Sequence, residues 1–316
     1  MKESIEYSEI TPDRFEEAIK LWIKVFGWDG RSYFENYYYH DPWYAPDCSL
    51  AVYVNGEMVS AVHICRRPVR VGGGTVWMGG IANVVTLEQY RRRGFSSELL
   101  ERALRVMEKH NIAFSTLGTG INRHYARHGW FTISTMNPSV SLRPGSLSPS
   151  PLRLEEVPWS PFPEVVQKLY GEFQDRLPVP FLRNEGYFHG WWYRRAREAG
   201  TLYLATENGS PVGYLLAKAE EDKIRILEMA SVAPKYDADL LHLVGELCLR
   251  LNKSRFEGEV PLLPGWVDIL REMGELSATC SYGTMFRPVC MSMDELVPVL
   301  AAYQSKLQPW WDPDGF

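Results

Sequence analysis

The sequence predicts an α/β fold made of two domains of one type, each with a mixed, mostly antiparallel sheet flanked by helices. Three observations lead to this prediction. Some segments carry apolar residues at helical spacing and others carry short continuous apolar runs. Two Asn-Gly pairs, Asn55-Gly56 and Asn208-Gly209, each separate two apolar runs, which is typical of β-hairpins. The 316 residues also suggest about two domains rather than one.

The first half of the chain alternates between the two kinds of element. Thr11 is a suitable N-cap and Pro12 a suitable first helical residue, so we expect a helix over residues 12–28. A glycine run, Gly72-Gly73-Gly74, predicts a second tight turn. The other expected elements are strands over residues 49–54, 58–64, 75–86, 112–117 and 131–134 and a helix over residues 97–109.

The second half repeats this order after an interruption. Seven prolines and six serines lie between residues 137 and 163 and indicate a connection between domains. Because no glycine lies between Ala233 and Leu243, the second copy has no evident phosphate-binding turn and is expected to be degenerate. The predicted elements are helices over residues 163–176, 184–198 and 239–252 and strands over residues 201–206, 211–218 and 223–232. The predicted parts are a catalytic domain (1–137), a connection (138–162), a degenerate domain (163–292) and a C-terminal helix and tail (293–316).

Composition excludes several classes of protein. The net charge of −5 argues against a general nucleic-acid binder. The longest weakly charged run, residues 72–87, is too short to cross a bilayer, and the charged start does not resemble a secretory signal. Five scattered cysteines form no metal-ligand spacing, so we expect free thiols in the cytoplasm and no metal.

The densest chemical signal is the basic turn Tyr90-Arg91-Arg92-Arg93-Gly94-Phe95-Ser96-Ser97, which joins an apolar strand to a helix. Backbone N–H groups at the start of a helix have no intrahelical partner and lie at the positive end of the helix dipole. Gly94 lets a phosphate approach the backbone, and arginines add charge-assisted contacts. The turn therefore predicts a pyrophosphate site, although an exposed basic turn without a ligand would look alike.

A second segment removes much of that ambiguity. Twenty-eight positions after Gly94 begins the run Asn122-Arg123-His124-Tyr125-Ala126-Arg127-His128-Gly129-Trp130-Phe131, where a short helix is expected to end at a glycine. With Arg91, Gly94 and Ser96 in the turn and Tyr125 and Gly129-Trp130 here, the chain resembles the GCN5-related N-acetyltransferase (GNAT) superfamily. Ser96 departs from the usual glycine or alanine, and its small size suggests little loss.

The likeness extends to one branch of that superfamily. Met78-Gly79-Gly80-Ile81, the turn, and Arg183 followed by Trp191-Trp192 are similar to the enhanced intracellular survival (Eis) acetyltransferases. That family has a GNAT domain, a degenerate GNAT domain and a sterol-carrier-like domain. Because this sequence stops at Phe316, we expect it to lack the third. The resemblance implies acetyl-CoA as co-substrate, with the backbone of Val84, Val85 and Thr86 along the pantetheine arm.

The pyrophosphate would be held by the turn. The residues that the resemblance assigns to it are Arg91, Arg92, Arg93, Gly94, Phe95, Ser96 and Ser97.

The resemblance also implies the chemical roles. Tyr125 would protonate the departing CoA thiolate, and the terminal carboxylate, here on Phe316, would serve as the base. A frayed end is the alternative reading of that tail. His124 is a weaker candidate base, and Asp41 and His63 can be named without a rank.

The acceptor is expected to be a primary amine of a small molecule or of a lysine. Aromatic residues cluster before the central strands, and Tyr37, Asp41 and Trp43 could form a wall for a cation. Simple core packing is the alternative. We expect one active site per chain and leave a homo-oligomer open. A CoA-binding sensor without turnover, or a donor with another acyl group, stays possible.

Overall fold

The computed structural model describes residues 3–316, and these form two compact units. The first unit contains the chain up to Ile133, Gly283–Val297 and Phe316, and the second contains Ser134–Tyr282 and Pro298–Gly315. Each unit has its own seven-stranded, mixed and mostly antiparallel sheet, as the sequence predicts.

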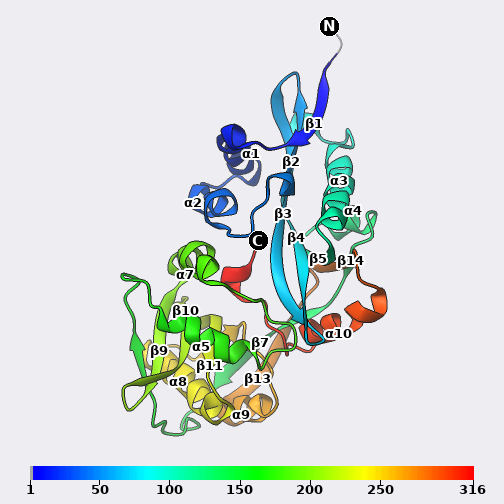
Figure 1. Cartoon of the computed structure of the whole chain (residues 1–316). Helices are drawn as coiled ribbons and strands as arrows, with labels where there is room; N and C mark the ends of the chain where they lie inside the picture. The colour runs from blue at the N-terminus through cyan, green and yellow to red at the C-terminus, as the bar shows by residue number, and fades with distance from the viewer. Residues whose placement is uncertain (1–2) are drawn as a thin grey trace. The chain divides into compact units, whose positions relative to one another are not determined.

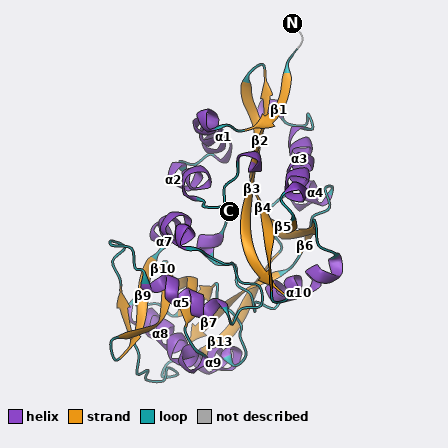
Figure 2. Cartoon of the chain, in the orientation of Figure 1, coloured by secondary structure: helices purple, strands orange, loops and turns teal. Residues whose placement is uncertain are grey.

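The sheet of the first unit has the order β1-β2-β3-β4-β5-β14-β6. Its strands are β1 (Ile5–Glu9), β2 (Ser49–Val54), β3 (Glu57–Val71), β4 (Gly74–Thr86), β5 (Ile112–Gly118), β14 (Thr284–Pro288) and β6 (Phe131–Thr132). All neighbours pair antiparallel except β4 and β5, which run parallel. Figure 2 shows β3 and β4 as a long pair of strands that run side by side.

Helices cover both sides of this sheet. In Figure 1, α1 and α2 lie on one side of β2–β4, and α3 and α4 lie on the other. The helical elements are η1 (Pro12–Arg14), α1 (Phe15–Phe26), α2 (Arg31–Glu35), η2 (Asn36–His40), η3 (Pro46–Cys48), η4 (Glu88–Tyr90), α3 (Phe95–Lys109) and α4 (Asn122–Ala126). The expected helix over residues 12–28 is thus confirmed as η1 and α1.

Local turn chemistry explains why the strands reverse where they do. Asn55 and Gly56 both have positive φ, at 50° and 85°, as a two-residue hairpin of this handedness requires. Gly72 and Gly73 have φ of 59° and 85° between β3 and β4. Both predicted turns are confirmed.

The second unit repeats the strand arrangement of the first. Its sheet has the order β13-β7-β12-β11-β10-β9-β8, and again a single pair, β11 with β12, is parallel. Its strands are β7 (Thr135–Leu142), β8 (Arg153–Glu156), β9 (Thr201–Glu207), β10 (Ser210–Ala219), β11 (Lys223–Ser231), β12 (Arg255–Gly258) and β13 (Gly274–Ser281). Its helical elements are α5 (Val165–Gln174), α6 (Glu185–Tyr187), η5 (Phe188–Trp192), α7 (Tyr193–Ala199), η6 (Pro234–Tyr236), α8 (Asp237–Arg250), α9 (Trp266–Met273) and η7 (Asp312–Asp314). Helix α10 (Met293–Gln304) begins among first-unit residues and ends among those of the second.

The predicted part boundaries need two corrections. The stretch 138–162 is more than a connection, because it contributes β7 and β8 to the second sheet. Residues 283–292 belong to the first unit, because β14 pairs with β5 and β6 of the first sheet. Both strands pair with segments far along the chain, which local composition does not encode.

A buried polar cluster holds the tail inside the second unit. The guanidinium of Arg183 donates to both oxygens of Glu228 at 2.7 and 2.9 Å and to both oxygens of Asp314 at 3.0 and 2.8 Å. Trp192 Nε1 donates to Glu228, and Trp191 Nε1 donates to the carbonyl of Pro313. The residues that resemble the Eis family here therefore anchor residues 313–314.

Candidate active site

The central feature of the first unit is a fork between its two parallel strands. The last pair in register between β4 and β5 is Gly80 with Thr116. Beyond it β4 stays paired with β3 as far as Thr86, while β5 stays paired with β14 as far as Gly118. The two strands thus separate, and the edge of β4 beyond Gly80 is left open for an extended ligand to pair with.

A β-bulge bends β4 within this fork. Ala61 of β3 faces Val85 and His63 faces Ala82, so Val62 lies opposite two residues of β4. Asn83, the extra residue, has φ of 52°, and such bulges turn a strand and increase its twist. The hydroxyl of the buried Ser60 donates to the carbonyl of Val85 at 2.6 Å and so fixes the strand after the bulge.

The basic turn lies directly beyond the open strand. Arg92 and Gly94 have φ of 63° and 83°, which reverses the chain sharply before α3. The first helical hydrogen bond of α3 runs from the amide of Glu98 to the carbonyl of Gly94, so the amides of the preceding residues lie outside the helical ladder. A Cβ at Gly94 would meet no atom within 4 Å. This helix start offers unpaired N–H donors and the positive end of a dipole.

The three arginines of the turn do different things. Arg91 and Arg92 line a cleft beside the end of β4, and Arg91 Nε also donates to the carbonyl of Thr86 at 3.3 Å. Arg93 does not line it. Its guanidinium pairs with both carboxylate oxygens of Glu3 and lies 4.8 Å from the centre of the Phe95 ring. The structure therefore gives Arg93 a role in fixing the turn rather than a place in the cleft.

Tyr125 also lines this cleft, and the segment that follows it in the chain fixes its position. The amide of Trp130 donates to the carbonyl of Tyr125 at 3.3 Å, and Trp130 Nε1 donates to Ser115 Oγ on β5 at 3.2 Å. Gly129 has φ of 86°, and a Cβ there would lie 2.9 Å from the guanidinium of Arg287. The contacts of Trp130 with Tyr125 and Ser115 thus hold the short helix α4 against β5.

Together these elements enclose a cleft of about 750 Å³. Apart from Arg93, every cofactor-binding residue expected from the sequence lines it, as does Tyr125. The lining residues are Val25, Val84, Val85, Thr86, Tyr90, Arg91, Arg92, Gly94, Phe95, Ser96, Ser97, Ile121, His124, Tyr125 and Arg127. The strand, the turn and the later aromatic segment, which are separate in sequence, thus form one site.

Burial sets the protonation of the two titratable rings in the cleft. Tyr125 is 7% exposed, and its burial raises the pKa of the phenol although a hydrogen bond with Thr119 opposes this. Burial lowers the pKa of His124, and the neighbouring His128 and Arg127 add to this effect. At neutral pH the phenol is therefore protonated and the imidazole uncharged, which suits a proton donor and a proton acceptor.

The residues expected to bind the acceptor lie elsewhere in the first unit. Tyr37 is fully buried, and its hydroxyl donates to that of Tyr33 at 2.8 Å. The Asp41 carboxylate accepts a hydrogen bond from the buried guanidinium of Arg67 at 2.7 Å. Trp43 is half-buried, and its carbonyl accepts from Arg66. None of Tyr37, Asp41 and Trp43 lines the cleft, and their acceptor role stays a prediction.

Phe316 lies against the vertex of the fork. A Cβ built on Gly80 would be 2.1 Å from two carbons of the Phe316 ring, so the ring occupies the space that a side chain would need. His63, named without a rank beside Asp41 as a base candidate, is buried in β3, and its Nδ1 is 3.2 Å from Ser49 Oγ. The role of the Phe316 carboxylate as base stays a prediction.

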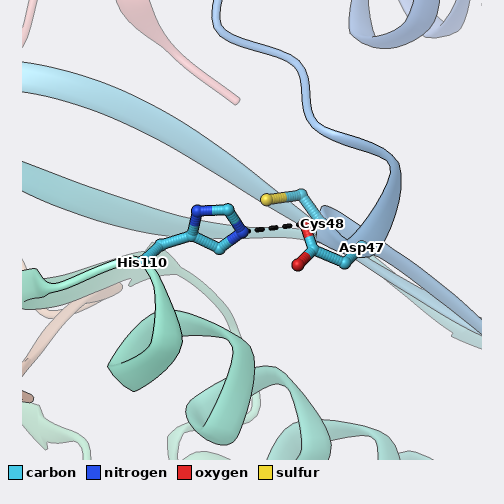
Figure 3. A group of neighbouring side chains, drawn as sticks. All are labelled: Asp47, Cys48 and His110. Atoms are coloured by element: carbon cyan, nitrogen blue, oxygen red, sulfur yellow. Dashed lines mark hydrogen bonds and ion pairs between the residues drawn. The ribbon is translucent and has the colours of Figure 1, made fainter.

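Figure 3 shows a different cluster of the first unit, formed by Asp47, Cys48 and His110. Their possible ligand atoms lie within 4.8 Å of one another. The Asp47 carboxylate already accepts from His110 Nε2 at 2.8 Å and from Lys109 Nζ at 2.7 Å. Burial raises the pKa of Cys48 to about 12, so the thiol is protonated. These contacts explain the cluster as an ion-pair network that ties η3 to the end of α3.

Several cleft residues escaped the sequence analysis. Val25 comes from α1, and its place in the cleft depends on how that helix packs. Ile121 and Arg127 flank the predicted Tyr125, and their proximity to it was the available signal. The positive φ of Asn83 has no marker in a single sequence, because asparagine is only somewhat enriched in that conformation.

The comparison with families of known sequence agrees with this geometry. Residues 6–133 match the model of the family described as acetyltransferase (GNAT) domain. This match covers most of the first unit. No curated protein matches the chain significantly.

Solved structures extend the GNAT likeness to most of the chain. A protein of Enterococcus faecalis described as a probable N-acyltransferase is 18% identical with a TM-score of 0.72, over 92% of this chain and 74% of that one. Eis1 from Mycobacterium abscessus is 16% identical with a TM-score of 0.65, over 90% and 74% of the two chains. N-myristoyltransferase of Saccharomyces cerevisiae, solved with myristoyl-CoA, is 13% identical with a TM-score of 0.53, over 90% and 84%. The fold of this chain is thus similar to the folds of these three proteins.

Within residues 3–316, none of the helices is both long enough and apolar enough to cross a membrane.

Proposed function

We propose that the protein is an N-acetyltransferase that transfers an acetyl group from acetyl-CoA directly to a primary amine in a ternary complex. The observation that carries this proposal is the joining of the β4–β5 fork, the basic turn and Tyr125 in one cleft. We also propose, on the sequence argument alone, that the protein acts in the cytoplasm.

The shape of the cleft supports CoA as the donor carrier. The pyrophosphate would meet the amides at the start of α3 together with Arg91 and Arg92. The pantetheine arm contains amides, and it would pair with the open edge of β4 at Val84 and Val85 as an added strand would. The edge amides of β4 after the bulge would meet the thioester oxygen and stabilise the charge that develops on it.

Proton transfer would be shared between the two rings of the cleft and one carboxylate. Tyr125, a neutral phenol whose pKa burial raises further, would donate a proton to the leaving thiolate. For the base we carry two candidates, uncharged His124 in the cleft and the carboxylate of Phe316. The acceptor, a small-molecule or lysine amine, must lose a proton before it attacks. Tyr37, Asp41 and Trp43 stay the sequence-based candidates for binding it.

Replacing Tyr125 with phenylalanine tests this function. We expect kcat for acetyl transfer to fall by about 100-fold, which is the usual contribution of a positioned general acid. CoA affinity, measured by calorimetry, should stay within about twofold, because the phenol makes no proposed contact with the nucleotide. Amines to be tried are an aminoglycoside, a polyamine and a lysine peptide, with products followed by mass spectrometry.

Tyr39→Phe is the matched control, because Tyr39 is 56% exposed in the same unit and outside the cleft. It should leave kcat unchanged. Unaltered turnover in the Tyr125→Phe variant would remove Tyr125 from the mechanism. Tight CoA binding without transfer to any amine would favour the second candidate function, a CoA-binding sensor.

A further inference from the structure

The contact between Phe316 and Gly80 lies where a donor's acyl chain would have to extend. Gly80 forms the last β4–β5 pair, so it marks the vertex of the fork. The lining of the cleft on β4 begins at Val84. Val84 is four residue steps beyond Gly80, which is about 13 Å of extended strand. A ligand that runs along β4 from the basic turn therefore approaches the Phe316 ring with its far end.

The ring sits on one defined face of β4. A Cβ on Gly79 would meet Met107 of α3 and Ile112 of β5, each at 3.1 Å, whereas a Cβ on Gly80 would collide with the Phe316 ring, with atoms at 2.1, 2.1 and 2.6 Å. Successive residues of a strand point to opposite faces, so Phe316 covers the face of β4 turned away from α3. Only glycine at position 80 leaves room for it.

We propose that the Phe316 ring closes the acyl end of the cleft and restricts the donor to acetyl and other short acyl groups. This inference rests on the proposed acetyltransferase function and adds a specificity-determining pair, Phe316 and Gly80. The reason is steric. A longer acyl chain must either displace the ring from Gly80 or bend out of the fork, and a site without room for one more methylene commonly discriminates about tenfold or more.

The test measures kcat/KM of the full chain with acetyl-, butyryl-, hexanoyl- and octanoyl-CoA, with products quantified by mass spectrometry. The unaltered protein should prefer acetyl over hexanoyl by about tenfold or more. Phe316→Ala should reduce that preference at least tenfold, and the ratio of kcat/KM for acetyl-CoA to kcat/KM for hexanoyl-CoA is the readout, because any role of the Phe316 carboxylate affects both donors alike. An equal preference in the two proteins would overturn the proposal.

Two glycine variants separate the effect of losing the Phe316–Gly80 contact from the effect of distorting β4 in general. Gly80→Ala places a methyl group where the ring lies, so it should expel the ring and shift donor preference in the same direction as Phe316→Ala. The two effects should not add in the double variant, because both act through one contact. Gly79→Ala crowds the opposite face and should leave donor preference unchanged. Equal shifts from both glycine variants would also overturn the proposal.

A binding measurement makes the outcome independent of turnover. S-ethyl-CoA and S-hexyl-CoA, thioethers that cannot transfer a group, are titrated by calorimetry. The hexyl compound should bind the unaltered protein about tenfold more weakly relative to the ethyl compound, and this gap should close in Phe316→Ala. If the amines stay unmodified while this gap behaves as expected, the catalytic proposal fails and the closure by Phe316 stands. No binding of either thioether would overturn both.

Discussion

Individual residues of this protein owe their chemistry to burial more than to their neighbours in sequence. His63 is an example, because it is 1% exposed within β3 and burial, with the positive charge of Arg67, lowers its pKa to about 3. Burial shifts the pKa of Tyr125 in the opposite direction, because it raises the pKa of a phenol. The sequence names such residues, but only their environment decides which proton state they hold.

His63 predicts a specific loss of stability in acid. Its folded pKa lies below its unfolded value of about 6.5, so between these values the unfolded state binds more protons. The contribution is complete above pH 6.5 and decreases as pH falls towards 3, by about 1.4 kcal/mol per pH unit. His63→Phe, which keeps an aromatic ring, should flatten the pH dependence of the unfolding free energy between pH 4 and 7 in urea titrations.

Tyr39→Phe gives the control for that measurement. It changes an exposed aromatic ring of the same unit and leaves every histidine in place, so its acid slope should match that of the unaltered protein. An unchanged slope in His63→Phe would show that other groups cause the acid sensitivity.

At the scale of elements, the turn between β4 and α3 is the best example of a structure that local sequence specifies. Its glycine has φ of 83° and an open surrounding, so the residue type follows from backbone geometry and not from crowding. The hairpin glycine Gly56 has almost the same φ, 85°, and is equally open. The two positions differ in that only Gly94 lines the cleft.

This pair allows backbone strain to be separated from binding. Gly94→Ala and Gly56→Ala should each destabilise the protein by about 1 to 2 kcal/mol, because an L-residue disfavours this left-handed conformation. Only Gly94→Ala should also weaken CoA binding, by about tenfold or more, which corresponds to 1.4 kcal/mol. Calorimetry and thermal melts on both variants check this, and equal CoA affinity in the two would contradict a phosphate site at the turn.

For the molecule as a whole, the second unit keeps the strand order of the first but differs from it where its two parallel strands, β11 and β12, stop pairing. The β11–β12 pairing ends at Ile226 with Gly258, and Glu228, two residues further on β11, is bound by Arg183. The same guanidinium holds Asp314 of the tail. In the second unit, a buried ion-pair cluster thus forms on β11 just beyond its last pair with β12.

The start of α8 is closed in a similar way. The buried carboxylate of Asp237, in the first turn of α8, is paired with Arg176, and one of its oxygens accepts from Trp266 Nε1 at 2.8 Å. This ion-paired carboxylate occupies the positive end of the helix dipole, where a phosphate would otherwise bind. The start of α8 in the second unit thus carries a buried ion pair, unlike the start of α3 in the first unit.

These features predict a single CoA site per chain. Calorimetric titration should give a stoichiometry of one, and Gly94→Val should abolish the binding heat altogether instead of leaving a second, weaker event. A stoichiometry near two, or residual binding in the variant at a similar affinity, would place a site in the second unit and contradict the prediction.

The sequence by itself determined the elements whose signals are local. The Asn55-Gly56 hairpin, helix α3 and the turn before it follow from residues within a few positions of one another, since turn conformation, helix capping and hydrophobic period act over that range. The motif residues Gly94 and Tyr125 were identifiable for the same reason, because each lies in a short segment of characteristic spacing.

Only the tertiary structure decided what depends on contacts between distant segments. Strand β14 enters the first sheet beside β5, and β7 enters the second from a stretch rich in proline and serine. The last β4–β5 pair (Gly80 with Thr116), the pairing of Arg183 with Asp314 and the contact of Phe316 with Gly80 join residues 36 to 236 positions apart. Strand pairing, charge burial and steric fit are properties of the packed chain, so no local sequence pattern predicts them.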